Sequence, residues 1–326
     1  MKKAILNMRL AAFAALSMVA GVALSQPGDY PTRPIRLVVG YPAGGASDVA
    51  ARIVSQKLSE RLGQSVVVDN RPGSAGNIGA DAVAKATADG YTLLLGTISL
   101  AVNPSLYPKM SYDPAKDLRA VSMISSTPFL LVTNPSAPYV SVSALLDAAR
   151  RDPGAINYAT AGNGSGSHLF TALFTKTAGI SLTHVPYKGA APAMNDVLGN
   201  QIPLTFDNIM TTLPLVKSGK LRAIAVSSGT RSSVAPDIPT LSESGVKGFD
   251  ASAWFGLFAP AGTPPDRIRR LNAELAEVLK DRQVADKLLQ LGAEPVHSSP
   301  EQFEKFFLEE IRKWKEVVRD ARIQVD

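Results

Sequence analysis

Apolar residues in the first half of the chain form short continuous runs, separated by segments with a helical pattern. Runs at 35–39, 66–69 and 91–96 have the length and composition of buried parallel strands, and the third strand is expected to end at 97–99. The segments between them, one ending near Gly63 and one spanning 77–88, have apolar residues at helical spacing. Strands and helices that alternate in this way pair in parallel and connect by right-handed crossovers. The pattern therefore predicts a doubly wound α/β sheet.

The same order of elements recurs in the second half of the chain. Strands are expected at 156–160, 182–186 and 202–206, with helices at 168–178 and 192–198. Sequence identity between the two copies is weak, but their element order and glycine-rich loops match. We therefore expect two similar lobes, each presenting loops at the carboxyl ends of its strands, where open α/β sheets bind ligands.

Two apolar segments, 128–132 and 254–258, are candidates for strands that cross between the lobes. One lobe then comprises residues 26–125 and 254–326, and the other comprises 126–253. The two lobes are thus expected to be joined by a hinge.

The C-terminal part of the chain is predicted to be helical, at 265–281, at 283–291 and from Pro300 onward. Aromatic and aliphatic residues at helical spacing are typical of a packing face rather than a binding surface. On the last helix this face carries Phe303, Phe306, Phe307, Ile311, Trp314 and Val318.

Residues 1–25 have the pattern of an export signal. A basic start precedes an apolar stretch that is too short to span a membrane. The small residues Ala23 and Ser25 then predict cleavage after Ser25 and a periplasmic mature protein. Without the three cations of the basic start, the formal net charge of +6 falls to +3, which does not indicate nucleic-acid binding.

The composition excludes several kinds of site. The chain has no cysteine, which removes thiolate zinc sites and cysteine nucleophiles, and only three histidines, which removes a histidine-rich metal site. An exported chain of about 300 residues without disulfides must be held together by its apolar core. No metal or other cofactor is expected.

The turn after the first strand, residues 40–48, is rich in glycine and leads into a helix. Backbone N–H groups at a helix N-terminus have no partner within the helix and, together with the helix dipole, favour an anion. Ser47 or Asp48 is expected to cap this helix, and Asp48 has the alternative role of accepting hydrogen bonds from a ligand. A tight turn requires glycine for its own sake, but a Gly/Ser loop recurs at 161–167, the matching place. The two loops therefore predict a carboxylate site.

The loop of the second half also invites two enzymatic hypotheses. A G-x-G-x-G pattern at 162–166 resembles a dinucleotide fingerprint, but its third glycine comes too early and the expected acidic residue is missing. Ser165, His168 and Asp207 could serve an exported α/β hydrolase, although Ser165 lacks the glycine-flanked nucleophile elbow. Serine and histidine three residues apart at a helix start more often cap the helix.

Other side chains have two interpretations each. Tyr41 and Tyr187 either cover the cleft or pack at the surface, and Arg71 either pairs with a carboxylate or stays solvated. His184 is expected to be a hydrogen-bonded core residue, and His297 is expected to lie at the surface.

Ordered motifs lie along the whole mature chain, at 39–48, 68–73, 76–79, 89–94, 158–168, 185–189, 206–208 and 254–264. This set resembles the Bug receptors, the extracytoplasmic solute-binding proteins of tripartite tricarboxylate transporters. The resemblance implies a two-lobed periplasmic binding protein fold of type II, with two doubly wound, mainly parallel sheets. Side chains at positions such as Ala46, Ser99 and Ala161 differ among members and do not identify the ligand.

The resemblance also implies a function without chemistry. A monomeric binding protein, rather than an enzyme, would close around one small organic acid or related polar metabolite. It would present this ligand to the membrane subunits of a tripartite tricarboxylate transporter, and nucleic acid has no part in this. A ligand sensor that is not tied to transport is the alternative.

In such receptors the loop after the first strand and its counterpart in the second lobe hold the carboxylate, partly through ordered water. Here these loops are 41–48 and 160–168. The expected ligand-binding residues in and around them are Tyr41, Pro42, Gly44, Gly45, Ser47, Asp48, Asn77, Thr97, Ser99, Thr160, Gly162, Gly164, Ser165, Ser167, His168, Tyr187, Gly189, Asp207 and Asn208.

Overall fold

The computed structural model describes residues 30–107 and 109–321. The chain divides into two units, residues 1–32 and 33–326, and the second unit is compact and contains all the strands and helices of the described residues. The predicted export signal, residues 1–25, lies outside the described residues. Among the described helices, none has both the length and the apolar character needed to cross a membrane.

The first half of the second unit forms the predicted parallel sheet. Its central strand, β1, pairs in parallel with β2 on one side and β3 on the other. All but one residue of β1 are buried, as expected for a strand covered on both faces. The elements are β1 (Ile35–Val39), α2 (Ala46–Leu62), β2 (Val66–Asn70), η1 (Ser74–Gly76), α3 (Asn77–Ala84) and β3 (Thr92–Thr97).

A helix that the sequence pattern does not predict, α4 (Ile98–Leu106), begins directly after β3. Ile98 and Ser99, expected at the strand end, therefore lie in its first turn. Most residues of α4 are buried, so its sequence lacks the polar face by which an amphipathic helix is recognised. The predicted helix at 77–88 is also shorter than expected, since α3 ends at Ala84.

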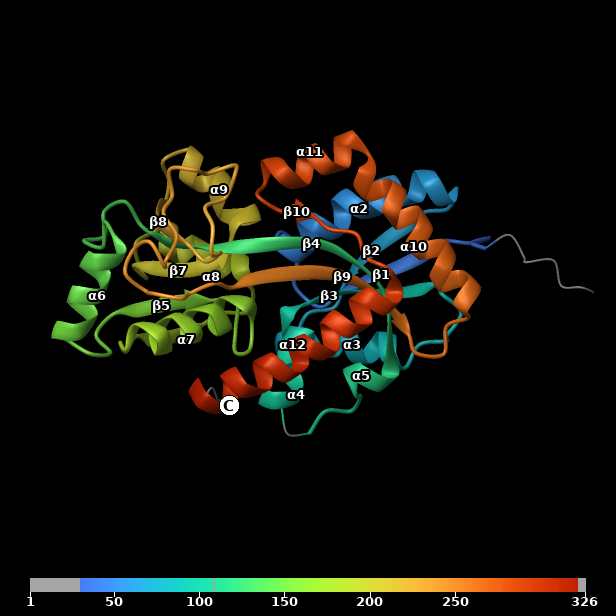
Figure 1. The fold of residues 1–326 in the computed structure, drawn as a ribbon, viewed down its shortest axis with the longest axis horizontal. Helices are drawn as coiled ribbons and strands as arrows, with labels where there is room; N and C mark the ends of the chain where they lie inside the picture. The colour runs from blue at the N-terminus through green and yellow to red at the C-terminus, as the bar shows by residue number, and fades with distance from the viewer. Residues whose placement is uncertain (1–29, 108, 322–326) are drawn as a thin grey trace, which may run out of the picture. The chain divides into compact units, whose positions relative to one another are not determined.

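The strand β4 (Leu118–Thr133) belongs to both halves of the second unit. Its first part pairs antiparallel with β9 (Ser252–Pro260), and its last part pairs antiparallel with β7 and β8 (Figure 1). The predicted crossing segment at 128–132 is thus confirmed within a longer strand. The segment at 254–258 belongs to β9, which pairs with β3 and β4.

The second half repeats the parallel arrangement around β5, which pairs in parallel with β6 and β7. Antiparallel pairs with β4 complete a mixed sheet, ordered β2-β1-β3-β9-β4-β7-β5-β6. Two helices of this half, α6 and α9, are absent from the predicted elements. The elements are α6 (Val142–Arg151), β5 (Asn157–Thr160), α7 (Gly166–Ala178), β6 (Thr183–Pro186), α8 (Ala190–Leu198), β7 (Leu204–Asn208), α9 (Ile209–Lys217) and β8 (Arg222–Val226).

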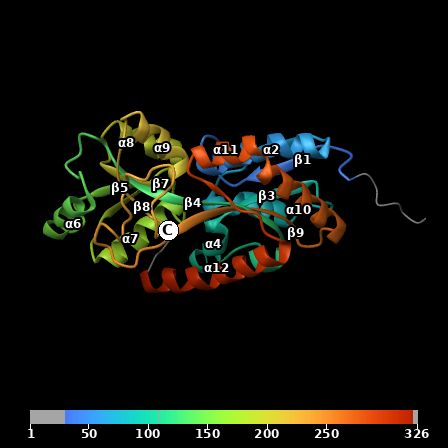
Figure 2. The same cartoon turned by 45° about the horizontal axis from the view of Figure 1, so that its top comes forward.

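The C-terminal helices pack on the first half, as Figures 1 and 2 show for α12 beside α4. The predicted packing face of α12 is confirmed, because Phe303, Phe307 and Trp314 are buried. The lobe boundaries near 125 and 254 stay a prediction, and β4 runs through the first of them. The remaining elements are α5 (Pro114–Asp117), α10 (Pro265–Lys280), α11 (Arg282–Gln290), β10 (Glu294–Pro295) and α12 (Pro300–Ala321).

Candidate functional site

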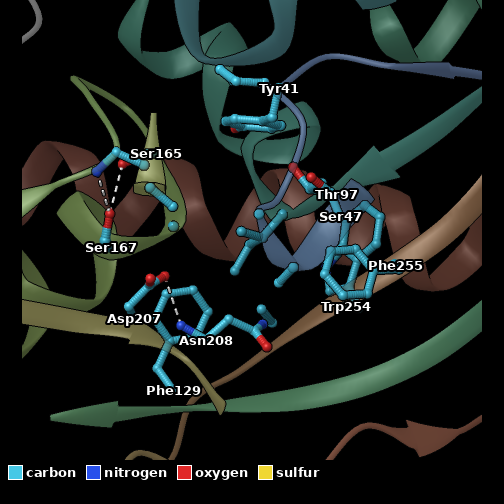
Figure 3. A pocket seen from close by; sticks show the side chains of 18 of the residues that line it. Tyr41, Ser47, Thr97, Phe129, Ser165, Ser167, Asp207, Asn208, Trp254 and Phe255 are labelled. Atoms are coloured by element: carbon cyan, nitrogen blue, oxygen red, sulfur yellow. Dashed lines mark hydrogen bonds between the residues drawn. The ribbon is translucent and has the colours of Figure 1, made fainter. Parts of the chain in front are cut away.

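A cavity lies where the loops of the two halves meet, with about 620 Å³ of space free of protein atoms, including its open mouth. Figure 3 shows Ser165 and Ser167 on one side of it and Ser47 and Thr97 on the other. The residues that line it are Tyr41, Pro42, Ala43, Gly45, Ala46, Ser47, Thr97, Ile98, Phe129, Ala161, Ser165, Gly166, Ser167, Ala190, Asp207, Asn208, Ala253, Trp254 and Phe255.

The N-terminus of α2 forms one wall of the cavity. Its N-cap is Gly45, in extended conformation (φ −83°, ψ 169°), and no described side chain caps it. The prediction that Ser47 or Asp48 caps this helix is therefore wrong. The first helical residues, Ala46 and Ser47, line the cavity, so this helix end presents backbone N–H groups to it.

Asp48 holds the loop in place instead of facing the cavity. Its Oδ2 accepts hydrogen bonds from Gly44 N at 3.0 Å and from Arg52 Nε at 2.9 Å, and its Oδ1 accepts from Asn70 Nδ2 at 3.1 Å. These hydrogen bonds hold the pKa of the carboxyl below its usual range, although burial acts in the opposite direction. The Asp48 side chain is thus an ionised brace that joins the loop, α2 and β2.

Four further helices also begin at the cavity. Thr97 is the N-cap of α4 and Gly189 that of α8, and neither helix end has a side-chain cap within the described residues. Ser165 caps α7 by accepting from His168 N, and Asn208 caps α9 by accepting from Met210 N. With α2, five helix N-termini converge on one cavity, each carrying the positive end of its dipole.

The charge in the cavity comes from backbone dipoles and one acidic residue. No lysine, arginine or histidine is found among the described residues that line it. Asp207 lies there, and its Oδ1 accepts a hydrogen bond from Asn208 N at 2.8 Å. Burial raises the pKa of Asp207 from 3.8 to about 6, so its proton is lost near neutral pH.

Aromatic side chains form the apolar part of the cavity wall. Trp254 and Phe255 come from β9, and Phe129 comes from β4 (Figure 3). All three side chains are buried, so these rings give the cavity an apolar interior next to its polar helix ends. Such a mixture of apolar walls and a few convergent polar groups is typical of small-molecule sites.

Hydrogen bonds join the two halves beside the cavity. Tyr41 Oη donates to Ser99 Oγ at 2.8 Å, and Ser99 Oγ donates to Gly164 O at 3.0 Å. A Cβ placed on Gly164 would lie 3.1 Å from Leu106 Cδ1 and 3.2 Å from Ala75 Cβ. The Gly/Ser loop of the second half therefore contacts the first half directly, and the two predicted loops share one crevice.

About half of the expected ligand-binding residues line the cavity: Tyr41, Pro42, Gly45, Ser47, Thr97, Ser165, Ser167, Asp207 and Asn208. Three others line an adjoining hollow, which also contacts Tyr41 and Pro42: Gly162, Tyr187 and Gly189. The rest line neither space: the exposed Gly44, and Asp48, Asn77, Ser99, Thr160, Gly164 and His168.

Two of the residues that line neither space are hydrogen-bonded to other side chains. Asn77 Oδ1 accepts hydrogen bonds from Asn103 Nδ2 at 2.9 Å and from Tyr112 Oη at 2.8 Å. Thr160 Oγ1 lies 2.6 Å from His184 Nε2, which confirms the expected hydrogen bond of His184, but this histidine is only partly buried and is not a core residue. Asn77 and Thr160 therefore support the site through these hydrogen bonds and do not contact the ligand themselves.

The Ser165–His168 pair has the geometry of a helix cap. Ser165 Oγ donates to Gly162 O at 2.6 Å, whereas His168 Nδ1 accepts from Gly164 N at 3.1 Å. The His168 ring stacks on His184 with centroids 4.1 Å apart. Burial, together with this neighbouring ring, lowers the pKa of His168 to about 4. The His168 imidazole is thus hydrogen-bonded to the backbone of the loop rather than to the Ser165 hydroxyl.

Two other expectations can be checked outside the cavity. Arg71 is exposed and its Nε donates to Asp69 Oδ2 at 2.8 Å, so it is a solvated arginine with a local partner. His297 is exposed, as predicted. Tyr187 lies at the adjoining hollow, where its Oη donates to Asp196 Oδ2 at 2.5 Å.

Sequence reasoning missed the apolar part of the cavity wall. Phe129, Trp254 and Phe255 were expected only as parts of crossing strands, and Ile98 as part of a strand end. A signal was available for the first three, because a strand that crosses between lobes must pass the cleft between them. Ala190 was also missed, although it follows Gly189 at the start of a helix.

Comparison with known proteins places the chain among transport receptors. The model of the tripartite tricarboxylate transporter family receptor matches residues 50–323. Protein BugT of Bordetella pertussis (strain Tohama I) is 42% identical over 305 residues, covering 93% of this chain and 94% of BugT.

Solved structures agree with this match. The structure of R. palustris Rpa4515 with adipate is 40% identical, has a TM-score of 0.88, and covers 90% of this chain and 99% of its own. MatC (Rpa3494) from Rhodopseudomonas palustris with bound malate is 32% identical, has a TM-score of 0.84, and covers 89% and 100%. The resemblance to Bug receptors and the two-lobed α/β fold are thereby confirmed. The chain belongs to the receptor family of the tripartite tricarboxylate transporters.

Proposed function

We propose that this protein captures a small carboxylate-type metabolite in the cavity and presents it to the membrane subunits of a tripartite tricarboxylate transporter. The predicted export signal supports a periplasmic location, with cleavage after Ser25, and a monomer suffices because one chain supplies the whole cavity wall. Relatives solved with adipate and with malate support a dicarboxylate or a similar organic acid as the ligand.

The observation that carries this proposal is the convergence of five helix N-termini on a cavity without a described basic side chain at its wall. Each helix end carries partial positive charge and unpaired N–H donors, which stabilise a carboxylate without a fixed arginine clamp. Three of the five ends, at Gly45, Thr97 and Gly189, have no side-chain cap within the described residues and so leave their N–H groups available.

Closure of the site around the ligand follows from where the walls originate. Ser47 and Thr97 come from the first half, whereas Ser167 and Asn208 come from the second. A ligand that contacts both halves favours the closed state, because only that state makes both sets of contacts at once. The closed surface is then what a membrane partner can recognise.

Binding without turnover is the expected chemistry of the site. The Ser165 hydroxyl donates its hydrogen bond to Gly162 O. The His168 imidazole has a low pKa and accepts a hydrogen bond from Gly164 N. A bound carboxylate would therefore leave the protein unchanged.

The test is a binding assay with adipate and malate, using adipamide and malamide as neutral controls of matched shape. Calorimetry and thermal melting would be measured together, since a ligand at 100 times its Kd stabilises the folded state by about 2.7 kcal/mol. We expect at least one acid to bind and neither amide to do so. Binding of both amides with equal affinity would refute the helix-terminus argument. Consumption of the acid, followed by NMR and abolished in His168→Ala, would refute binding without chemistry.

A further inference from the structure

One buried carboxylate holds both tryptophans of the protein. The chain contains two tryptophans, Trp254 and Trp314. The Nε1 atoms of both donate to the same oxygen, Glu310 Oε2 of α12, each at 3.0 Å. The other oxygen, Oε1, pairs with Lys313 Nζ at 3.2 Å. Glu310 is only 6% exposed, and these three partners satisfy the oxygens of its buried carboxylate.

One arm of this cluster ends in the cavity wall. Trp254 lines the cavity and is 2% exposed. Behind it, the ring packs edge-on against Phe303, Phe306 and Phe307 of α12, with centroids 5.7, 5.9 and 6.0 Å away. Edge contacts with rings leave an indole some freedom to tilt, whereas a hydrogen bond to its single N–H fixes the direction of that edge.

The other arm reaches the cavity wall at Phe129. Trp314 lies 6.3 Å from Phe170 of α7, and Phe170 stacks on Phe129 at 4.3 Å with the two planes 8° apart. Phe129 lines the cavity from β4. From Glu310, one path therefore runs to the wall formed by β9 and a second path runs to the wall formed by β4 and α7.

We infer that Glu310 is a positioning residue of the ligand site, which sets the orientation of Trp254 and, through Trp314 and Phe170, of Phe129. The inference rests on the proposed function, because it assigns to Glu310 the shape of that cavity. Without the carboxylate, two buried indole N–H groups lose their acceptor, and such groups rotate to find another partner. The aromatic wall then loses the shape that fits the ligand.

The experiment compares four variants of the full chain. Glu310→Leu removes the acceptor, Glu310→Gln keeps an oxygen that can accept both N–H groups, and Glu310→Asp keeps the charge on a shorter stem. Leu145→Ala, at a buried position of α6 and outside the cavity wall, is the control for loss of stability alone. Binding of adipate is measured by calorimetry, and the near-UV circular dichroism of the two tryptophans is recorded without ligand.

The expected outcomes separate positioning from stability. Glu310→Leu should weaken adipate binding roughly tenfold, and Glu310→Asp roughly threefold, because each leaves buried donors without a good acceptor. Both should change the tryptophan spectrum of the ligand-free protein. Glu310→Gln should keep the wild-type affinity for adipate and the wild-type tryptophan spectrum. Leu145→Ala should melt at a lower temperature, with its affinity and its spectrum unchanged.

Two results would overturn the inference. One is wild-type affinity and spectrum in Glu310→Leu or, if that variant does not fold, in Glu310→Asp. The other is an affinity loss in Leu145→Ala as large as that in the Glu310 variants. Failure of wild-type protein to bind adipate or malate would instead contradict the proposed function, and the ligand-free spectra would still show whether Glu310 orients the tryptophans.

Discussion

Asp207 offers the sharpest test of the electrostatics of the cavity, through the substitution Asp207→Asn. Burial raises the pKa of this carboxyl from 3.8 to about 6 in the folded protein. Between these two pH values the unfolded chain has lost the proton while the folded chain keeps it. The folded state binds more protons there, so the contribution of Asp207 to stability falls as pH rises through this window.

The size of the effect follows from the two pKa values. A difference of about two pH units corresponds to about 3 kcal/mol, and partial access of solvent to Asp207 reduces this to about 1–2 kcal/mol. The variant should therefore gain about 1–2 kcal/mol over wild type between pH 4 and pH 7. Asparagine keeps an oxygen that can accept from Asn208 N, so this hydrogen bond is preserved.

Urea denaturation of both proteins at pH 4, 5, 6, 7 and 8 measures the difference directly. Because all other titrating groups are common to both, subtracting the two curves isolates Asp207. Adipate binding should show the same trend, since an ionised Asp207 repels a carboxylate ligand and the asparagine does not. A stability difference that stays constant with pH, or that favours wild type as pH rises, would refute the reasoning.

Three further substitutions test the site and the fold. Gly45→Val should fold, since the N-cap is extended, but should abolish adipate binding in calorimetry by filling the cavity; full affinity would contradict the anion site. Ser99→Ala removes the hydrogen bond from Ser99 Oγ to Gly164 O, which contributes about 1 kcal/mol, so the rate of adipate release in stopped-flow experiments should rise about fivefold. An unchanged release rate would contradict a role of Ser99 in closure. Gly256→Ala would place a Cβ against the ring of the buried Phe303, and its melting temperature should drop by several degrees; a wild-type melt would contradict this packing.

Local sequence pattern was sufficient for the elements whose chemistry is local. The apolar runs at β1 and β3 and the parallel pairing around them follow from composition and alternation with helices. The Gly/Ser loops were placed correctly because each follows the carboxyl end of a parallel strand, and the antiparallel pairs through β9, β4 and β7 turn these ends toward each other. These features depend on residues close together in the chain.

The errors concern partners that are distant in sequence. Asp48 was expected to cap its helix, but Asn70 Nδ2, which is 22 residues away, helps to hold its carboxylate outside the cavity. Ser99 was expected to face the ligand, but it lies in a helix that a continuous apolar run conceals. The role of Trp254 depends on Glu310, which is 56 residues later. The spacing of apolar residues along the sequence does not reveal such contacts.

The shared strand β4 has a thermodynamic consequence. Its 16 residues supply backbone partners to β9 on one side of the molecule and to β7 and β8 on the other. Melting the strands of either half would therefore remove hydrogen bonds from the strand on which the other half depends. The two halves of the second unit should denature as a single cooperative step, with one calorimetric peak whose van't Hoff and measured enthalpies agree.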